Sequence, residues 1–117
     1  MIKELKESTD ELLALEFEGR IDENDYKQIH TMVEKVTANT GDPLLLLDVH
    51  DLEGITPAAL CERIRDQDDF NQFAKVAMVG DKAWQEMIVK VFGTLMKPAA
   101  RFFEPEERQQ ALQWLKN

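Results

Sequence analysis

The stretch PLLLLDV, residues 43–49, decides the fold class that the sequence predicts. It is short and almost continuously apolar, which is typical of a central strand covered by helices on both faces of a sheet. Two further strands are predicted for residues 73–80 and 100–103. Because helical patterns separate these strands, the order of elements favours an α/β domain with a mixed, largely parallel sheet.

The amino-terminal residues predict a β-hairpin ahead of this alternation. Residues 2–7 alternate weakly and favour an edge strand, and residues 8–11 form the predicted turn. The next segment, LLALEFEG at residues 12–19, alternates between apolar and acidic side chains, which is typical of a half-buried strand. Its predicted faces are Leu13, Leu15 and Phe17 on one side, and Glu16 and Glu18 on the other.

Helix signals follow each predicted strand. Asp22 is a favourable N-cap for the first helix, which residues 39–41 end, and Thr56 with Pro57 begins a second helix. A third helix is predicted for Lys82–Met96, and a last one opens at residues 104–107. We therefore expect one domain over residues 1–117, with a five-stranded mixed sheet and about four helices. The inward-facing side chains are predicted to be Tyr26, Ile29, Val33 and Val36 in the first helix, and Leu112 and Leu115 in the last.

Composition narrows the class of function. The formal net charge of −9 argues against nucleic-acid binding, which needs a clustered basic surface. The single cysteine, Cys61, cannot form an internal disulfide and fits a reducing compartment. Since the amino terminus lacks the apolar core of a signal peptide and no run approaches the ~20 apolar residues of a membrane span, we expect a cytoplasmic protein.

Three segments resemble the bacterial SpoIIAA-like family: LLLLDVHDLEG at 44–54, VAMVGDKAWQ at 76–85 and ARFFEPEERQQALQWL at 100–115. The resemblance covers essentially the whole chain and implies a STAS-type fold, which is also similar to the lipid-binding Sec14 (CRAL-TRIO) domain. It implies two functions. One is a regulator switched by a phosphorylated serine at the start of the second helix. The matching residues 54–60, GITPAAL, contain no serine, although Thr56 offers a hydroxyl. The other is binding of an apolar ligand or a membrane.

Polar residues gather at the predicted carboxyl ends of two strands. Asp48, His50 and Asp51 follow the central strand, where open α/β sheets usually bind ligands. They could bind a metal or act as acid and base, but a polar strand-to-loop transition explains them more simply and is the interpretation we favour. Asp81 and Lys82 follow the next strand and could cap the third helix or hold an anion. We assign no metal site, no catalytic residue and no cofactor.

The third predicted helix has a broad apolar surface. A helix on a sheet commonly needs an apolar stripe of only ~100°, whereas this one covers about half the circumference. Between Asp81 and Arg101 four positive charges face two negative ones, so the segment carries +2 in an acidic chain. This pattern favours an interfacial membrane helix or a gate over a ligand, while burial in the core or a homodimer surface remains open. The apolar residues are Trp84, Met87, Ile88, Val91, Phe92, Leu95 and Met96.

The main prediction is therefore a non-enzymatic binding domain for an apolar or amphipathic small molecule, with reversible contact at the inner membrane face. The alternative is a STAS-type regulator that acts through a protein partner, without the usual phosphorylated serine. An enzyme using Asp48, His50 and Asp51 ranks below both. The predicted lining residues are Leu60, Ile64, Trp84, Met87, Ile88, Val91, Phe92 and Leu95, with polar contacts from Asp48, His50, Asp81 and Lys82.

Overall fold

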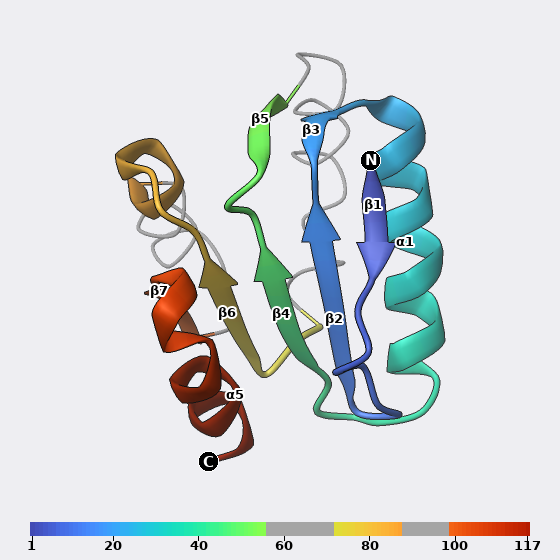
Figure 1. Cartoon of the computed structure of the whole chain (residues 1–117). Helices are drawn as coiled ribbons and strands as arrows, with labels where there is room; N and C mark the ends of the chain where they lie inside the picture. Colours follow the sequence, from blue (N-terminus) through green and yellow to red (C-terminus); the bar gives the residue numbers. More distant parts are fainter. Residues whose placement is uncertain (56–71, 88–98) are drawn as a thin grey trace.

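A five-stranded mixed sheet forms the centre of the computed structural model, which describes residues 1–55, 72–87 and 99–117. The strand order is β1-β2-β4-β6-β7, with β1 antiparallel to β2 and the remaining neighbours parallel (Figure 1). This confirms the predicted fold class and the amino-terminal hairpin. The strands are β1 (Ile2–Glu4), β2 (Leu12–Phe17), β4 (Leu44–Asp48), β6 (Lys75–Val79) and β7 (Ala99–Phe103).

Three α-helical segments lie within the described residues, slightly fewer than the four or so expected. They are α1 (Glu23–Thr37), residues 83–87, and α5 (Arg108–Lys116), which follows the short 3-10 helix η1 (Pro105–Glu107). The helix predicted to begin at Thr56 lies outside the described residues. Within these residues, no helix is long and apolar enough to cross a bilayer.

Helix α1 covers one face of the sheet. Asp22 is its N-cap, as predicted, and its side chain accepts a hydrogen bond from the backbone N–H of Asp25 at 2.8 Å. The Asp25 carboxylate in turn accepts a hydrogen bond from the Asp22 backbone N–H, so two otherwise unpaired N–H groups are satisfied at the helix start. The buried side chains are the four predicted from the helical spacing: Tyr26, Ile29, Val33 and Val36.

Helix α5 covers the opposite face. Its Ala111 and Leu115 pack against Leu46 and Ala77 of the central strands. The prediction that β2 is half-buried is wrong, because Leu12 and Ala14 on its second face are also buried in this cluster. Since α1 and α5 cover opposite faces of the sheet, β2 contributes apolar side chains to both cores.

A second, two-stranded parallel sheet was not predicted. Strand β3 (Gly19–Ile21) pairs with β5 (Leu52–Ile55), and Figure 1 shows both continuing beyond the ends of β2 and β4. Gly19 begins β3 with φ of 64°, a left-handed conformation that glycine adopts without steric cost. The sequence signal is weak because each strand is so short.

Candidate functional site

The carboxyl ends of β2 and β4 bring acidic side chains together. Glu16 and Asp48 are direct register partners on these parallel strands, so both side chains lie on the face that α5 covers. His50, two residues beyond Asp48, lies in the turn that follows β4. Arg108 at the start of α5 reaches this edge from the far end of the chain. We call Glu7, Glu16, Asp48, His50, Asp51 and Arg108 the charged cluster.

Arg108 holds two carboxylates at once. Its Nη1 lies 2.6 Å from Asp48 Oδ2, and its Nε donates to Glu7 Oε2 at 2.8 Å. Burial is the largest single influence on Glu7 and would raise its pKa, but the hydrogen bonds from Arg108 and from the backbone, together with the nearby positive charges, lower the pKa below its ordinary value. The Asp48 side chain is only 4% exposed, so its charge depends on this partner.

The His50 ring lies between two carboxylates. Its Nδ1 contacts Asp48 Oδ1, and its Nε2 lies 3.1 Å from Asp51 Oδ2. The hydrogen bond to Asp48 raises the pKa of His50 above its ordinary value, and the charges of Asp48 and Asp51 act in the same direction. A cationic imidazole is therefore favoured at this edge.

Glu16 is the least compensated acid of the charged cluster. Burial raises its pKa, and a hydrogen bond with Glu18 and the negative charge of Asp48 raise it further. Glu18 forms an ion pair with Lys3 of the edge strand β1, with 3.0 Å between Lys3 Nζ and Glu18 Oε1. The cluster therefore keeps an excess of acidic groups.

A second polar arrangement lies at the end of β6, and we call it the Gln85 bridge. Gln85 is fully buried, and its Nε2 donates to the carbonyl oxygen of Val49 at 2.6 Å. Its Oε1 accepts hydrogen bonds from the backbone N–H groups of Asp81 (3.0 Å) and Lys82 (3.2 Å). One side chain thus joins the turn after β4 to the start of the third helix.

Gly80 makes the Gln85 bridge sterically feasible. A Cβ atom at this position would lie 2.4 Å from Gln85 Oε1 and 3.2 Å from a Val49 methyl carbon. The helix begins at residue 83, one residue later than predicted, and the side chain of Gln85 accepts hydrogen bonds from the two backbone N–H groups just before it, those of Asp81 and Lys82. Lys82 extends its Nζ to the His50 carbonyl oxygen at 2.8 Å.

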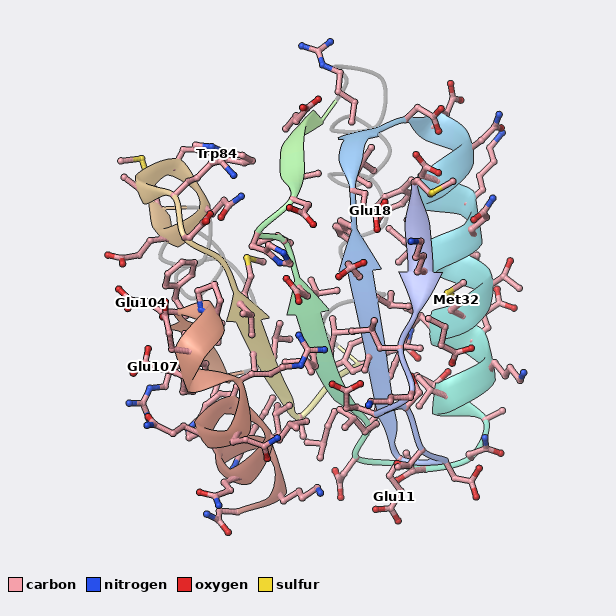
Figure 2. The ribbon with its side chains drawn as sticks, viewed as in Figure 1. Glu11, Glu18, Met32, Trp84, Glu104 and Glu107 are labelled. Atoms are coloured by element: carbon pink, nitrogen blue, oxygen red, sulfur yellow. The ribbon has the colours of Figure 1, made fainter. Side chains whose placement is uncertain are left out.

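Trp84 and Met87 are the predicted lining residues that the structure describes, and both are exposed. Trp84 is 37% and Met87 65% accessible, and Figure 2 shows Trp84 at the upper edge of the molecule. Asp48, His50, Asp81 and Lys82 do lie at one edge of the sheet, as predicted, and Lys82 contacts the His50 backbone. The other predicted lining residues lie outside the described residues: Leu60, Ile64, Ile88, Val91, Phe92 and Leu95.

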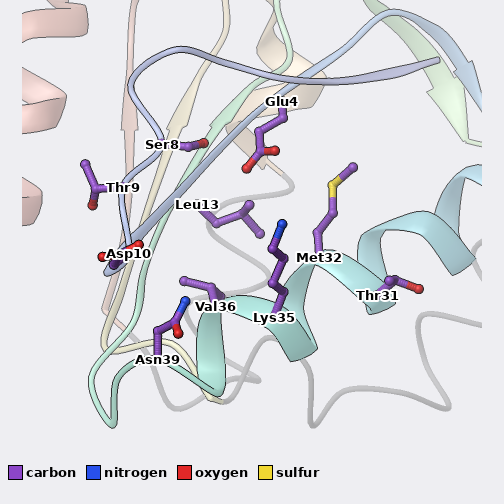
Figure 3. Close-up of a pocket in the computed structure, with 10 residues that line it drawn as sticks. All are labelled: Glu4, Ser8, Thr9, Asp10, Leu13, Thr31, Met32, Lys35, Val36 and Asn39. Carbon is purple, nitrogen blue, oxygen red and sulfur yellow. The ribbon is translucent and has the colours of Figure 1, made fainter.

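A cavity of about 470 Å³ lies elsewhere, between the turn after β1 and helix α1. Figure 3 shows Met32 and Lys35 of α1 beside it, with Ser8 and Thr9 on the opposite side. The hydroxyls of Ser8 and Thr9 already bond to the backbone of the turn, so they serve its structure. Neither Trp84 nor Met87, the two predicted lining residues within the described part of the chain, borders this cavity.

Sequence reasoning missed the residues that connect distant segments. Neither Arg108 nor Gln85 was given a role from the sequence. Arg108 and Asp48 are 60 positions apart, and Gln85 and Val49 are 36 apart. The one available signal was Gln85 itself, a neutral polar residue directly after Trp84 on a helix with a broad apolar surface.

The fold matches several solved structures. A DUF3478-family protein with a SpoIIAA-like fold from Shewanella loihica PV-4 shares 25% identity over 98% of this chain and 90% of that one, with a TM-score of 0.76. The anti-sigma factor antagonist SpoIIAA shares 12% identity over 97% and 98%, with a TM-score of 0.63. An anti-sigma factor antagonist from Mycobacterium paratuberculosis shares 16% identity over 100% and 96%, with a TM-score of 0.61. The last two likenesses show the fold alone.

No curated protein sequence matches the chain significantly. A protein-family model described as SpoIIAA-like does match, over residues 12–116. These residues include all three segments on which the resemblance was based, and the structure superposes on a solved SpoIIAA-like fold with a TM-score of 0.76. The chain therefore belongs to the SpoIIAA-like family.

Proposed function

We propose that this chain is a regulatory domain that works by binding a protein partner. Two of the solved structures with this fold are anti-sigma factor antagonists, which supports the regulatory alternative over the small-molecule prediction. None of the similar proteins reported above is described as lipid-binding, so the lipid interpretation gains no support from them. The same comparisons favour a non-enzymatic role.

The observation that carries the proposal is the exposure of Trp84 and Met87 on a rigidly held helix start. Exposed aromatic and methionine side chains are enriched at protein interfaces, because they bury large apolar areas at low entropic cost. The buried Gln85 lies between them in sequence and fixes the helix start to the turn after β4. A partner would therefore meet a preorganised surface, which reduces the ordering cost of binding.

Phosphorylation is not required by this proposal. The residues that match the switching segment of the family, 54–60, contain no serine. We therefore expect a Thr56→Ala variant to bind the same partner as the wild type.

Site-specific photocrosslinking in the native host tests the proposal. A photoreactive residue placed at Met87 should yield one discrete crosslinked protein, identified by mass spectrometry, and an added Trp84→Glu change should abolish it. The matched control is Gln28, an exposed position on α1 away from this surface. Equal capture from Met87 and Gln28, or a crosslink only to a second copy of the chain, would contradict the proposal. If the Met87 probe crosslinked only to lipid, and the protein floated together with anionic vesicles, the result would support membrane binding instead.

A further inference from the structure

We propose that Glu16, Asp48 and His50 bind a divalent first-row transition-metal ion, with Zn²⁺ bound more tightly than Mn²⁺. Each of the three residues offers one ligand atom, and within the described part of the chain these atoms lie within 4.8 Å of one another. The site is independent of the partner surface at Trp84 and Met87, and it is not one of the roles that the family resemblance implied.

The backbone sets the three donors side by side. Glu16 and Asp48 face each other across the parallel β2–β4 pair, and His50 follows two residues later on the same side. Donors around one Zn²⁺ at about 2.0–2.2 Å lie roughly 3–4 Å apart. The Glu16 side chain is partly exposed, so a small rotation suffices to bring its carboxylate to that spacing.

The groups around the donors have the arrangement that metal sites use. A metal-bound histidine usually gives its second ring N–H to a carboxylate, which leaves the other nitrogen for the ion. His50 Nε2 lies 3.1 Å from Asp51 Oδ2, so Nδ1 is the nitrogen that faces Glu16 and Asp48. Arg108 likewise holds Asp48 Oδ2 at 2.6 Å, so Oδ1, the oxygen that contacts His50 Nδ1, is the one that would bind the ion. Both contacts orient a donor without blocking it.

Charge favours a cation at this point. Five carboxylates gather here against two permanently charged side chains, and Arg108 is itself shared with Glu7. In the metal-free protein His50 Nδ1 contacts Asp48 Oδ1. The proton between these two atoms lies where the metal ion would bind. Binding of the metal would release the Nδ1 proton to solvent and replace one hydrogen bond with two metal–ligand bonds. The acidic groups are Glu7, Glu16, Glu18, Asp48 and Asp51, and the cations are Lys3 and Arg108.

The donor set selects the class of ion. One imidazole nitrogen with two carboxylate oxygens suits Zn²⁺, Mn²⁺ or Fe²⁺, whereas Mg²⁺ prefers oxygen donors alone. Affinity for such a site rises from Mn²⁺ to Zn²⁺ in the usual order of divalent ions. Three protein donors leave at least one coordination position for water, because zinc is commonly four-coordinate.

Metal titration of the purified, chelator-treated chain tests the proposal. Competition with a chromogenic chelator should show one Zn²⁺ per chain, with weaker Mn²⁺ binding, and nuclear magnetic resonance should show the ion at the His50 ring. His50→Gln and Glu16→Gln should each weaken Zn²⁺ binding at least about tenfold, since each removes a donor. His30→Gln is the matched control, because His30 lies on α1 in contact with Glu34 and should leave the affinity unchanged.

Asp51→Asn separates a built site from chance binding. This variant keeps all three donors and removes only the carboxylate behind the His50 ring, so affinity should fall about 10–100-fold while circular dichroism stays unchanged. The proposal is overturned if millimolar Zn²⁺ does not bind the wild type. It is also overturned if binding survives His50→Gln and Glu16→Gln unweakened, or if His30→Gln is the variant that removes it.

Discussion

The charged cluster and the Gln85 bridge hold the same edge of the sheet by different physical means. Arg108 joins α5 to β4 through an ion pair that is partly open to water, with 27% of the Arg108 side chain exposed. Gln85, whose side chain is fully buried, joins the third helix to the turn after β4 through a neutral hydrogen bond that is itself buried. The first contact should respond to pH and ionic strength, and the second should respond to neither. At this edge, the contacts of the charged cluster should therefore vary with pH, whereas those of the Gln85 bridge should not.

Removing the cation of the charged cluster should have the largest effect. We expect Arg108→Met to lower the free energy of unfolding by about 3 kcal/mol, because the buried Asp48 carboxylate would lose its permanently charged partner and keep only His50. Urea denaturation at neutral pH measures this loss. Arg101→Met is the matched control: Arg101 is exposed and lies over the Phe103 ring at 5.0 Å, a contact worth about 0.5–1 kcal/mol. Equal losses in the two variants would show that Asp48 does not depend on Arg108.

Removing the hydrogen bonds of the Gln85 bridge should lower the free energy of unfolding somewhat less than Arg108→Met does. We expect Gln85→Leu to lower stability by about 2 kcal/mol, although the side-chain volume is kept. The backbone N–H groups of Asp81 and Lys82 would lose their acceptor. The carbonyl oxygen of Val49 would keep only its hydrogen bond from the Leu52 N–H. The same urea measurement on Gln113→Leu, an exposed position of α5, should change stability by less than about 0.5 kcal/mol. A Gln85→Leu effect that varied with salt would contradict the neutral character of the bridge.

A side chain added at Gly80, against the Gln85 bridge, should lower the free energy of unfolding by a smaller amount. In Gly80→Ala the new Cβ would meet Gln85 Oε1 at 2.4 Å and Phe102 at 3.1 Å, and we expect a loss of about 1–2 kcal/mol. Gly41→Ala is the control, since nothing lies within 4 Å of a Cβ there. The loss should shrink when Gly80→Ala is combined with Gln85→Ala, which removes the clashing oxygen. If the stability losses of the two single variants simply added up in the double variant, the strain would come from a contact other than the one with Gln85 Oε1.

Deprotonation of His50 should change the stability least of all. It should also distinguish the charged cluster, which depends on pH, from the Gln85 bridge, which does not. Its folded-state pKa is raised above the ordinary value of 6.5, so the imidazolium stabilises the fold fully below that value. This contribution is lost as the pH rises through the raised pKa. In chelator-containing buffer, the stability difference between wild type and His50→Gln should therefore shrink with rising pH, while that between wild type and Gln85→Leu stays constant. A His50→Gln difference that grew with pH would contradict the sign of the shift.

Much of the fold was predictable because its signals are local. The apolar run before Asp48 indicated a buried strand, and the spacing from Tyr26 to Val36 indicated the buried face of α1. Prediction failed for the second face of β2, where Ala14 is too small to signal burial beside Glu16. It also failed for the pairing of β3 with β5, because the backbone hydrogen bonds of two short strands leave little trace in side-chain pattern.

The candidate site was predicted only as a location. The sequence alone determined that Asp48, His50, Asp81 and Lys82 would lie at the carboxyl ends of neighbouring strands, because parallel strands end at one edge of their sheet. Only the tertiary structure decided which charges meet there. Arg108 contacts Asp48 from 60 positions away, and Gln85 turns inward because its amide can satisfy buried backbone groups. Such contacts depend on how the helices are placed against the sheet, and no local pattern specifies that placement.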